Sequence, residues 1–150
     1  MELKFRVSAR IAKPVDRVFE AVANPSELQS YFTTGGASER LRPGATVMWA
    51  FADFPGQFPV EVIEVVPSSR IVFRWPSDEA DVPARTTLVT MTFEPLDDAR
   101  TLVTICEEGW SSTPAGLKAS YGNCQGWTQM LCSLKAHLEH GINLRSGMYA

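Results

Sequence analysis

The segment ASYGNCQGWTQMLCSLKAHLEHG, residues 119–141, carries both histidines of the chain and two of its three cysteines. Imidazole and thiolate groups are common ligands of zinc in proteins. His137 and His140 are three residues apart, so a helix would place them on one face. A zinc site needs three or four ligands, however, and Cys124 and Cys132 lie two or more helical turns from His140. We therefore predict no metal site, and a pair of surface histidines that the negative end of the helix dipole favours.

The cysteines Cys106, Cys124 and Cys132 are odd in number and form no C-x-x-C pair. A nucleophilic cysteine needs a basic neighbour that stabilises its thiolate. No such neighbour supports Cys124. We therefore predict reduced thiols, with Cys124 and Cys132 packed in the helix as small apolar side chains.

A carboxylate is the stronger chemical candidate. Glu107 has the same strand parity as Val103 and Ile105, so it faces the interior if they do. There it could orient a polar group of a ligand, or act as an acid with a raised pKa. The alternative is that the strand has frayed into solvent at Glu107, or that Glu107 pairs with a cation such as Arg74.

Large apolar side chains share the expected inner face of several strands and of the last helix. Together with Glu107 they form the predicted lining of an interior site: Trp49, Phe51, Phe73, Trp75, Met91, Phe93, Ile105, Glu107, Trp127 and Leu131. An apolar cavity with few polar groups is the usual form of a small-molecule site. Strand aromatics more simply fill a core, so cavity and packed core are both open at this point. No cofactor is expected.

The elements that position these residues follow from periodicity and turn residues. Alternation of apolar and polar residues is typical of strands, and Pro-Gly, Pro-Ser-Ser and Asp-Asp pairs or runs are typical of turns. Turns are expected at residues 55–56, 67–69 and 97–98. Strands are expected at residues 2–11, 46–53, 58–66, 71–75, 86–94 and 101–108. Such short connections indicate an antiparallel meander.

Three helices are expected. Pro14 suits the first turn of one helix, and Asn24-Pro25 ends it and opens a second. A long helix follows Thr113 as its N-cap and ends at Gly141, with one apolar stripe of Cys124, Trp127, Leu131, Leu134 and Leu138. Gly122 is open to two interpretations: it makes room for a ligand, or the regular helix begins only at Asn123.

This order of elements predicts one α+β domain over residues 1–150, in which an antiparallel sheet of about six or seven strands curves around the long helix. The net charge of -3 argues against a nucleic-acid partner. Apolar residues make up 45% of the chain, but no run approaches the ~20 residues of a membrane span. Charged residues near the N-terminus predict a cytoplasmic protein without a signal peptide.

The chain also resembles a known family. It is similar to the SRPBCC, or START-like, superfamily with its Bet v 1-like helix-grip fold, and within it to the group named after the activator of heat-shock-protein-90 ATPase homologue. The resemblance rests on the order and spacing of these segments: PVDRVFEAVANPSELQSYF, RLRPGATVMWAF, VEVIEVVPSSRIVFRW, TLVTMTFEP, RTLVTICEEGW, and Tyr121 followed by Gly126-Trp127, Leu131 and Leu134. It implies the helix-grip fold, whereas this fold serves several functions.

Three functions are therefore considered. The first is a non-enzymatic protein that binds a small hydrophobic molecule or lipid between the sheet and the long helix. The second, implied by the resemblance, is an activator of a heat-shock chaperone ATPase. The third is a cyclase or dehydratase in which Glu107 is the acid or base. A monomer and a homodimer are both compatible with the sequence.

Overall fold

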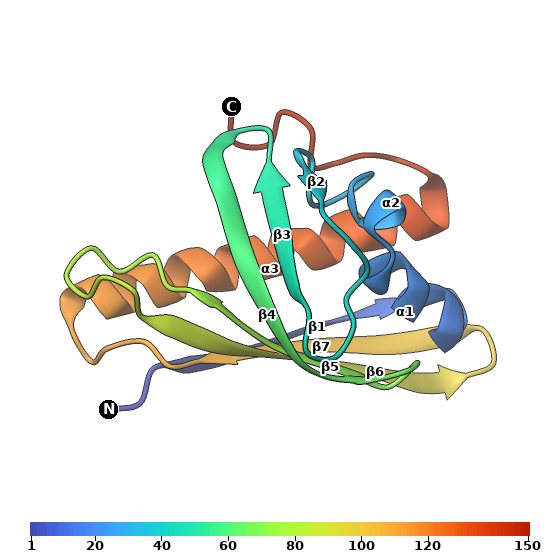
Figure 1. Ribbon diagram of the computed structural model, residues 1–150. Coiled ribbons are helices and arrows are strands. Elements are labelled where there is room, and N and C mark those ends of the chain that lie inside the picture. The colour runs from blue at the N-terminus through green and yellow to red at the C-terminus, as the bar shows by residue number, and fades with distance from the viewer.

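A seven-stranded antiparallel sheet curves around one long helix in the computed structural model, which describes residues 1–150 (Figure 1). The strands lie in the order β1-β7-β6-β5-β4-β3-β2, so the first and last long strands pair. The elements are β1 (Lys4–Ile11), α1 (Val15–Ala23), α2 (Pro25–Leu28), β2 (Gly36–Ala37), β3 (Thr46–Phe51), β4 (Phe54–Val66), β5 (Arg70–Pro76), β6 (Thr86–Asp97), β7 (Arg100–Glu108) and α3 (Pro114–His140). The predicted α+β helix-grip architecture is confirmed.

The strands follow the predicted alternation. In β1 every second side chain, from Phe5 to Ile11, turns toward the interior, while Lys4, Arg6 and Arg10 stay exposed. The same alternation buries Val89, Met91 and Phe93 in β6 and Val103 and Ile105 in β7. One face of the sheet therefore supplies the core, and the other faces solvent.

The predicted turn at Pro55-Gly56 is wrong. The chain reverses earlier, because Phe51 pairs with Phe54 across Ala52-Asp53. Ala50 pairs with Gln57, so Pro55 and Gly56 are extra residues that bulge from β4. Gly56 has a φ of +84°, a conformation in which a residue with a Cβ is strained. A Pro-Gly pair thus marks a strand bulge here rather than the turn itself.

The long helix has the predicted ends. The side chain of Thr113 accepts a hydrogen bond from the Gly116 amide at 3.0 Å, and Gly141 ends the helix with a φ of +66°. Gly122 lies well inside α3, so the interpretation that the helix begins at Asn123 is wrong. A Cβ added to Gly122 or Gly126 would meet nothing within 4 Å. None of the helices combines the length and hydropathy that crossing a membrane requires.

Helix α3 packs most closely on β1, at one edge of the sheet. Two of its side chains reach the backbone at the end of that strand: Lys135 Nζ donates to the Arg10 carbonyl at 2.8 Å, and the Ala12 amide donates to Glu139 Oε2 at 3.0 Å. Helices α1 and α2 lie near the C-terminal end of α3 (Figure 1). Large side chains fill the space between α3 and the middle strands.

Candidate functional site: a carboxylate beneath an aromatic cluster

Six aromatic rings meet between α3 and the sheet. We call them the aromatic cluster: Phe32, Trp49, Phe51, Phe73, Trp75 and Trp127. Ring centroids are 5.3 Å apart for Trp75 and Trp127, 5.4 Å for Trp49 and Phe73, and 5.5 Å for Phe32 and Trp49. These separations are typical of aromatic contact. β3, β5, α3 and the segment after α2 each contribute to the cluster.

The structure brings all ten predicted lining residues to this interior. Phe51 and Trp75 are half-buried, and the other eight are buried: Trp49, Phe73, Met91, Phe93, Ile105, Glu107, Trp127 and Leu131. The rings touch one another, so the side chains themselves fill the space in this structure. Sequence reasoning missed Phe32, which lies outside the strands and the long helix and therefore has no place in their periodicity.

Glu107 lies at the inner end of the aromatic cluster with 1% of its surface exposed. Its Oε1 accepts hydrogen bonds from Trp75 Nε1 at 2.9 Å, Thr87 Oγ1 at 2.6 Å and Asn123 Nδ2 at 2.9 Å. Its Oε2 accepts from Trp127 Nε1 at 2.8 Å and from Asn123 Nδ2 at 3.2 Å. The carboxylate therefore joins β5, β6, β7 and α3 through neutral donors alone.

This environment settles how Glu107 is held. It has not frayed into solvent, and Arg74 is exposed on the other face of the sheet, so both of those alternatives are wrong. Burial raises the pKa of Glu107, and the hydrogen bonds from Thr87, Trp75, Trp127 and Asn123 offset part of that rise. A carboxylate accepts about four hydrogen bonds, so its acceptor capacity is already used.

One polar group of the cluster has no partner. Trp49 is fully buried, and its Nε1 makes no hydrogen bond. The indoles of Trp75 and Trp127, by contrast, both donate to Glu107. Leaving a buried donor unpaired costs about 1–3 kcal/mol, which makes such a group rare in a folded protein. The buried hydroxyls of Thr33 and Ser133 are also unpaired, but Trp49 Nε1 is the one indole donor of the aromatic cluster without an acceptor.

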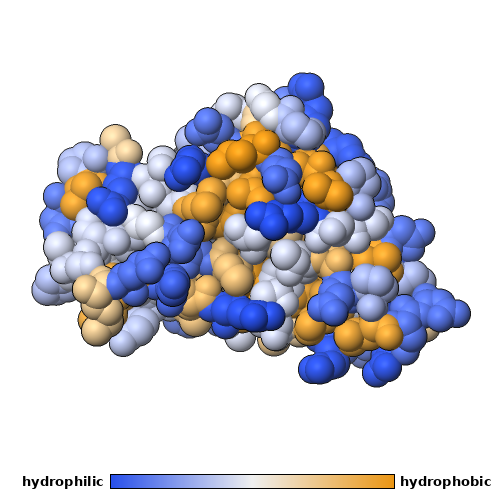
Figure 2. Space-filling view, turned by 90° about the horizontal axis from the view of Figure 1, so that it is seen from below, coloured by the Kyte–Doolittle hydropathy of each residue, from blue (hydrophilic) through white to orange (hydrophobic).

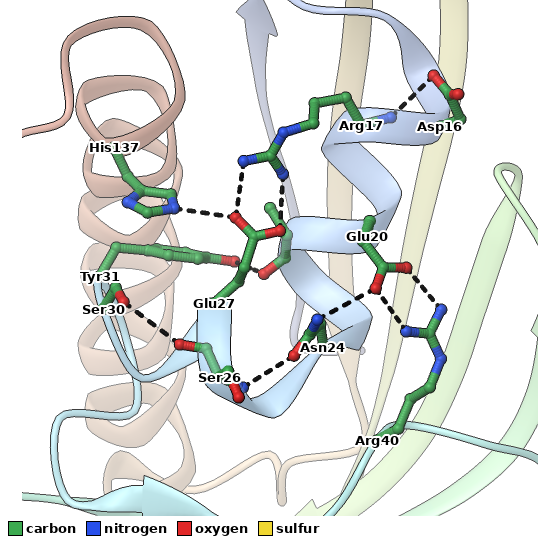
Figure 3. A network of polar contacts seen from close by, with 11 residues as sticks. Asp16, Arg17, Glu20, Asn24, Ser26, Glu27, Ser30, Tyr31, Arg40 and His137 are labelled. Atoms are coloured by element: carbon green, nitrogen blue, oxygen red, sulfur yellow. Dashed lines mark hydrogen bonds and ion pairs between the residues drawn. The ribbon is translucent and has the colours of Figure 1, made fainter.

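His137 is not the surface residue that was predicted. Its Nε2 lies 3.2 Å from Glu27 Oε1, and its ring stacks on Tyr31 with centroids 5.1 Å apart. The Arg17 guanidinium donates two hydrogen bonds, of 2.7 and 2.8 Å, to the same carboxylate, as Figure 3 shows. The pKa of Glu27 is lowered by Arg17 and His137 against the opposing effect of burial. The group ties α1, α2 and α3 together, whereas His140 is exposed as predicted.

The cysteines differ from one another. Cys124 is half-buried, but Cys132 is exposed, so its predicted packing is wrong. The buried side of α3 is centred on Trp127, Leu131 and Leu134. Successive side chains on an α-helix are about 100° apart, so Cys132, which follows Leu131, points away from the buried side. Cys106 is a half-buried residue of β7.

The C-terminal segment 142–150 returns to the tip of the β3–β4 hairpin (Figure 1). Arg145 is buried there and binds Asp53 through two hydrogen bonds of 2.5 and 2.7 Å. Its guanidinium also lies over the rings of Phe51, at 5.5 Å, and Tyr149, at 4.6 Å. The hydrogen bonds to Arg145 lower the pKa of Asp53. This contact covers the outer end of the aromatic cluster at Phe51.

The opposite face of the sheet carries two shallow hollows. One is lined by Lys4, Phe5, Arg6, Leu88, Thr90, Cys106, Glu107 and Glu108. Arg74, Arg85, Trp110 and Ser112 are among the residues that line the other. Seen from below, hydrophobic residues on the molecular surface are interspersed with hydrophilic ones (Figure 2). None of the six rings of the aromatic cluster lines either hollow.

Comparison with known proteins gives a family and a fold. The family described as "Activator of Hsp90 ATPase homolog 1-like protein" matches residues 12–139. No curated protein matches the chain. Protein SSP2350 from Staphylococcus saprophyticus is 25% identical, with 95% of this chain and 96% of that chain covered and a TM-score of 0.78.

Two further structures are similar. DynU16, a protein from the dynemicin biosynthetic locus, is 26% identical with a TM-score of 0.79, and the match covers 95% of this chain and 49% of that one. The Aha1 dimer from Colwellia psychrerythraea is 18% identical with a TM-score of 0.74, and the match covers 93% of this chain and 98% of that one. The latter likeness concerns the fold alone.

Proposed function

The chain belongs to the family of activator of Hsp90 ATPase homolog 1-like proteins, and from this premise we propose that it binds a small, neutral, apolar molecule between the sheet and α3. The observation that carries the proposal is the aromatic cluster. Six rings converge on one interior, and one deeply buried carboxylate lies at its inner end. A largely apolar interior with few polar groups is suited to such a molecule.

The charges around the cluster favour a neutral ligand. Glu107 has no cation among its hydrogen-bond partners, so a second anion beside it would be repelled in a poorly screened environment. At the outer end, the charge of Arg145 is already matched by Asp53. A fatty acid would therefore bind less well than an uncharged molecule of similar size.

Binding requires that a ligand displace side chains, because the rings are in contact. Entry beside Phe51 requires movement of the C-terminal segment, because Arg145 lies over its ring. Phe51 is half-buried at the outer end of the cluster and touches Phe32, Phe54 and Phe58. Glu107 is less suited to catalysis, because a substrate would first have to replace one of its donors. Binding is therefore favoured over the cyclase or dehydratase function.

Thermal unfolding in the presence of neutral aromatics, sterols and fatty acids tests the proposal. A ligand at 100 times its Kd stabilises the folded state by about 2.7 kcal/mol, which raises the Tm by several degrees. Phe51→Ala should weaken this effect, whereas Leu117→Ala, at an exposed site on α3, should preserve it. Absence of stabilisation and of bound mass by native mass spectrometry for every class would refute binding.

The family match over residues 12–139 supports a second candidate, stimulation of a heat-shock chaperone ATPase. The measurement is ATP turnover by the chaperone of the same cell with and without this protein. A saturable increase in turnover supports activation, and unchanged turnover over a wide range of concentrations removes it. The two candidates are separable, because ligand binding and ATP turnover are measured independently, and Phe51→Ala is expected to weaken ligand binding.

A further inference from the structure

We propose that the ligand of the aromatic cluster carries a neutral hydrogen-bond acceptor, a carbonyl oxygen, which accepts a hydrogen bond from Nε1 of Trp49. The inference rests on the proposed binding function and narrows it to a class of ligand: flat, uncharged ketones rather than plain hydrocarbons or carboxylic acids. The observation that carries it is the unpaired indole N–H at a fully buried position.

The three tryptophans of the cluster differ in how their N–H groups are used. Those of Trp75 and Trp127 are committed to Glu107, at 2.9 and 2.8 Å. Trp49 is in ring contact with Trp75 at 5.9 Å, yet its own N–H has no acceptor. A ligand oxygen that reached Trp49 would pair the one indole donor of the cluster that the protein leaves free.

The surroundings of Trp49 decide which kind of acceptor fits. Phe32, Phe73 and Trp75 all lie within 6 Å of its ring, centroid to centroid. A buried water needs two to four polar partners, whereas these rings offer mainly apolar surface. A carbonyl on a flat apolar molecule would satisfy the N–H and cover the rings together. A carboxylate would place a second negative charge near Glu107.

Trp110 provides a natural comparison within the same chain. Its Nε1 is also unpaired, and its ring stacks on Phe5 at 5.5 Å. Trp110 belongs to the connection between β7 and α3, however. It lines one of the two hollows on the outer face of the sheet, together with Arg74 and Ser112. Solvent therefore lies near Trp110, whereas Trp49 is enclosed by other aromatic rings.

A matched pair of probes tests the inference: 1-tetralone and tetralin, which share one bicyclic shape and differ by the carbonyl oxygen. The readout is the ¹H–¹⁵N spectrum of the four indole N–H groups, together with affinity from the same titration. We expect 1-tetralone to bind about five- to tenfold more tightly than tetralin. We also expect the Trp49 proton to move downfield with the ketone and to move less with the hydrocarbon.

Variants separate the hydrogen bond from the apolar contact. Trp49→Phe keeps an aromatic ring and removes the donor, so the affinity ratio of the two probes should fall to about one. Trp110→Phe, the control, should leave the ratio unchanged. If Trp49→Phe unfolds the protein, the shift of the Trp49 indole proton in the unmodified protein still shows whether 1-tetralone accepts its hydrogen bond.

The possible outcomes distinguish the inference from the function on which it rests. Equal binding of both probes, with no selective shift of Trp49, overturns the carbonyl inference and leaves apolar binding intact. Failure of both probes to bind at millimolar concentration counts against the binding function itself. Preference for the ketone that persists in Trp49→Phe assigns the acceptor to another donor and overturns the inference.

Discussion

At the scale of single residues, Glu107 explains how the interior is ordered. A buried charge is tolerated only when hydrogen bonds replace its hydration. Five bonds from four neutral side chains do so here, and two of them fix the indoles of Trp75 and Trp127. The carboxylate therefore sets the orientation of the aromatic cluster as well as its polarity.

Replacing Glu107 by Gln tests this role. The amide nitrogen of Gln is a donor, so it would meet Trp, Thr and Asn donors and leave at least one of them unpaired. We expect the free energy of unfolding near neutral pH to fall by about 1–3 kcal/mol, measured by urea denaturation. Glu108→Gln, one residue away but on the other face of β7, should change it by less than about 0.5 kcal/mol. Equal effects of the two variants would contradict the assignment.

The raised pKa of Glu107 predicts a pH dependence. A carboxyl group whose pKa is higher in the folded than in the unfolded protein adds most stability below its ordinary value of 4.5. That contribution is lost as the pH rises through the folded-state pKa. We therefore expect the stability of the unmodified protein, relative to Glu107→Gln, to decline from pH 4.5 upward. Parallel stability curves for the two proteins would show that Glu107 does not titrate differently on folding.

The sequence indicates which way Glu107 points but not what it binds. Parity with Ile105 predicts the inner face, and the structure confirms it. Thr87 shares the parity of Val89, and Asn123 precedes Trp127 by about one helical turn, so both partners carry a weak signal. Pairing them with Glu107 requires the register of β6 on β7 and the rotation of α3, which spacing along one chain does not define.

At the scale of elements, the glycines of α3 have opposite roles. Gly122 and Gly126 lie in the helix interior with open space around them. Ala at each position should raise the free energy of unfolding by about 0.5–1 kcal/mol, because it restricts the unfolded backbone. Gly116 differs: a Cβ there would lie 1.9 Å from the Ser111 carbonyl oxygen. Gly116→Ala should therefore destabilise the protein, and thermal unfolding of the three variants compares them directly.

Long elements are predictable here because their patterns are long. In β1 and β6 every second residue turns inward over most of the strand. The apolar residues of α3 likewise repeat every three or four positions over several turns. β2 spans only Gly36–Ala37, which is too short to show a period. Pro55-Gly56 resembles a turn in the sequence, and only the pairing of Ala50 with Gln57 identifies it as a bulge.

At the scale of the whole molecule, the C-terminal segment closes the structure across a large distance in sequence. Arg145 and Asp53 are 92 residues apart, so no local pattern predicts their contact. Breaking a buried ion pair on one side leaves the other charge unmatched. The C-terminal segment has few other anchors in the core. If Asp53 loses its charge, release of the segment should therefore expose the unmatched Arg145 to water with a small effect on the rest of the fold.

Trypsin tests the attachment of the tail, because Arg145 is itself a cleavage site. Asp53→Asn should accelerate the loss of residues 146–150, measured by mass spectrometry, while the Tm changes by only a few degrees. Glu39→Gln removes the partner of the exposed Arg42 and should leave this rate unchanged. A cleavage rate at Arg145 that is the same in all three proteins would show that Asp53 does not hold the tail.

The clamping of β1 by α3 has a consequence for how copies of the chain meet. β1 is an edge strand, and an edge strand with free backbone groups can pair with a strand of another molecule and seed aggregation. Lys135 donates a hydrogen bond to the Arg10 carbonyl, and Glu139 accepts one from the Ala12 amide, so neither backbone group is free. Exposed Lys4, Arg6 and Arg10 add like charges along the same strand. The helix that closes the interior thus also shields the end of this edge from intermolecular strand addition.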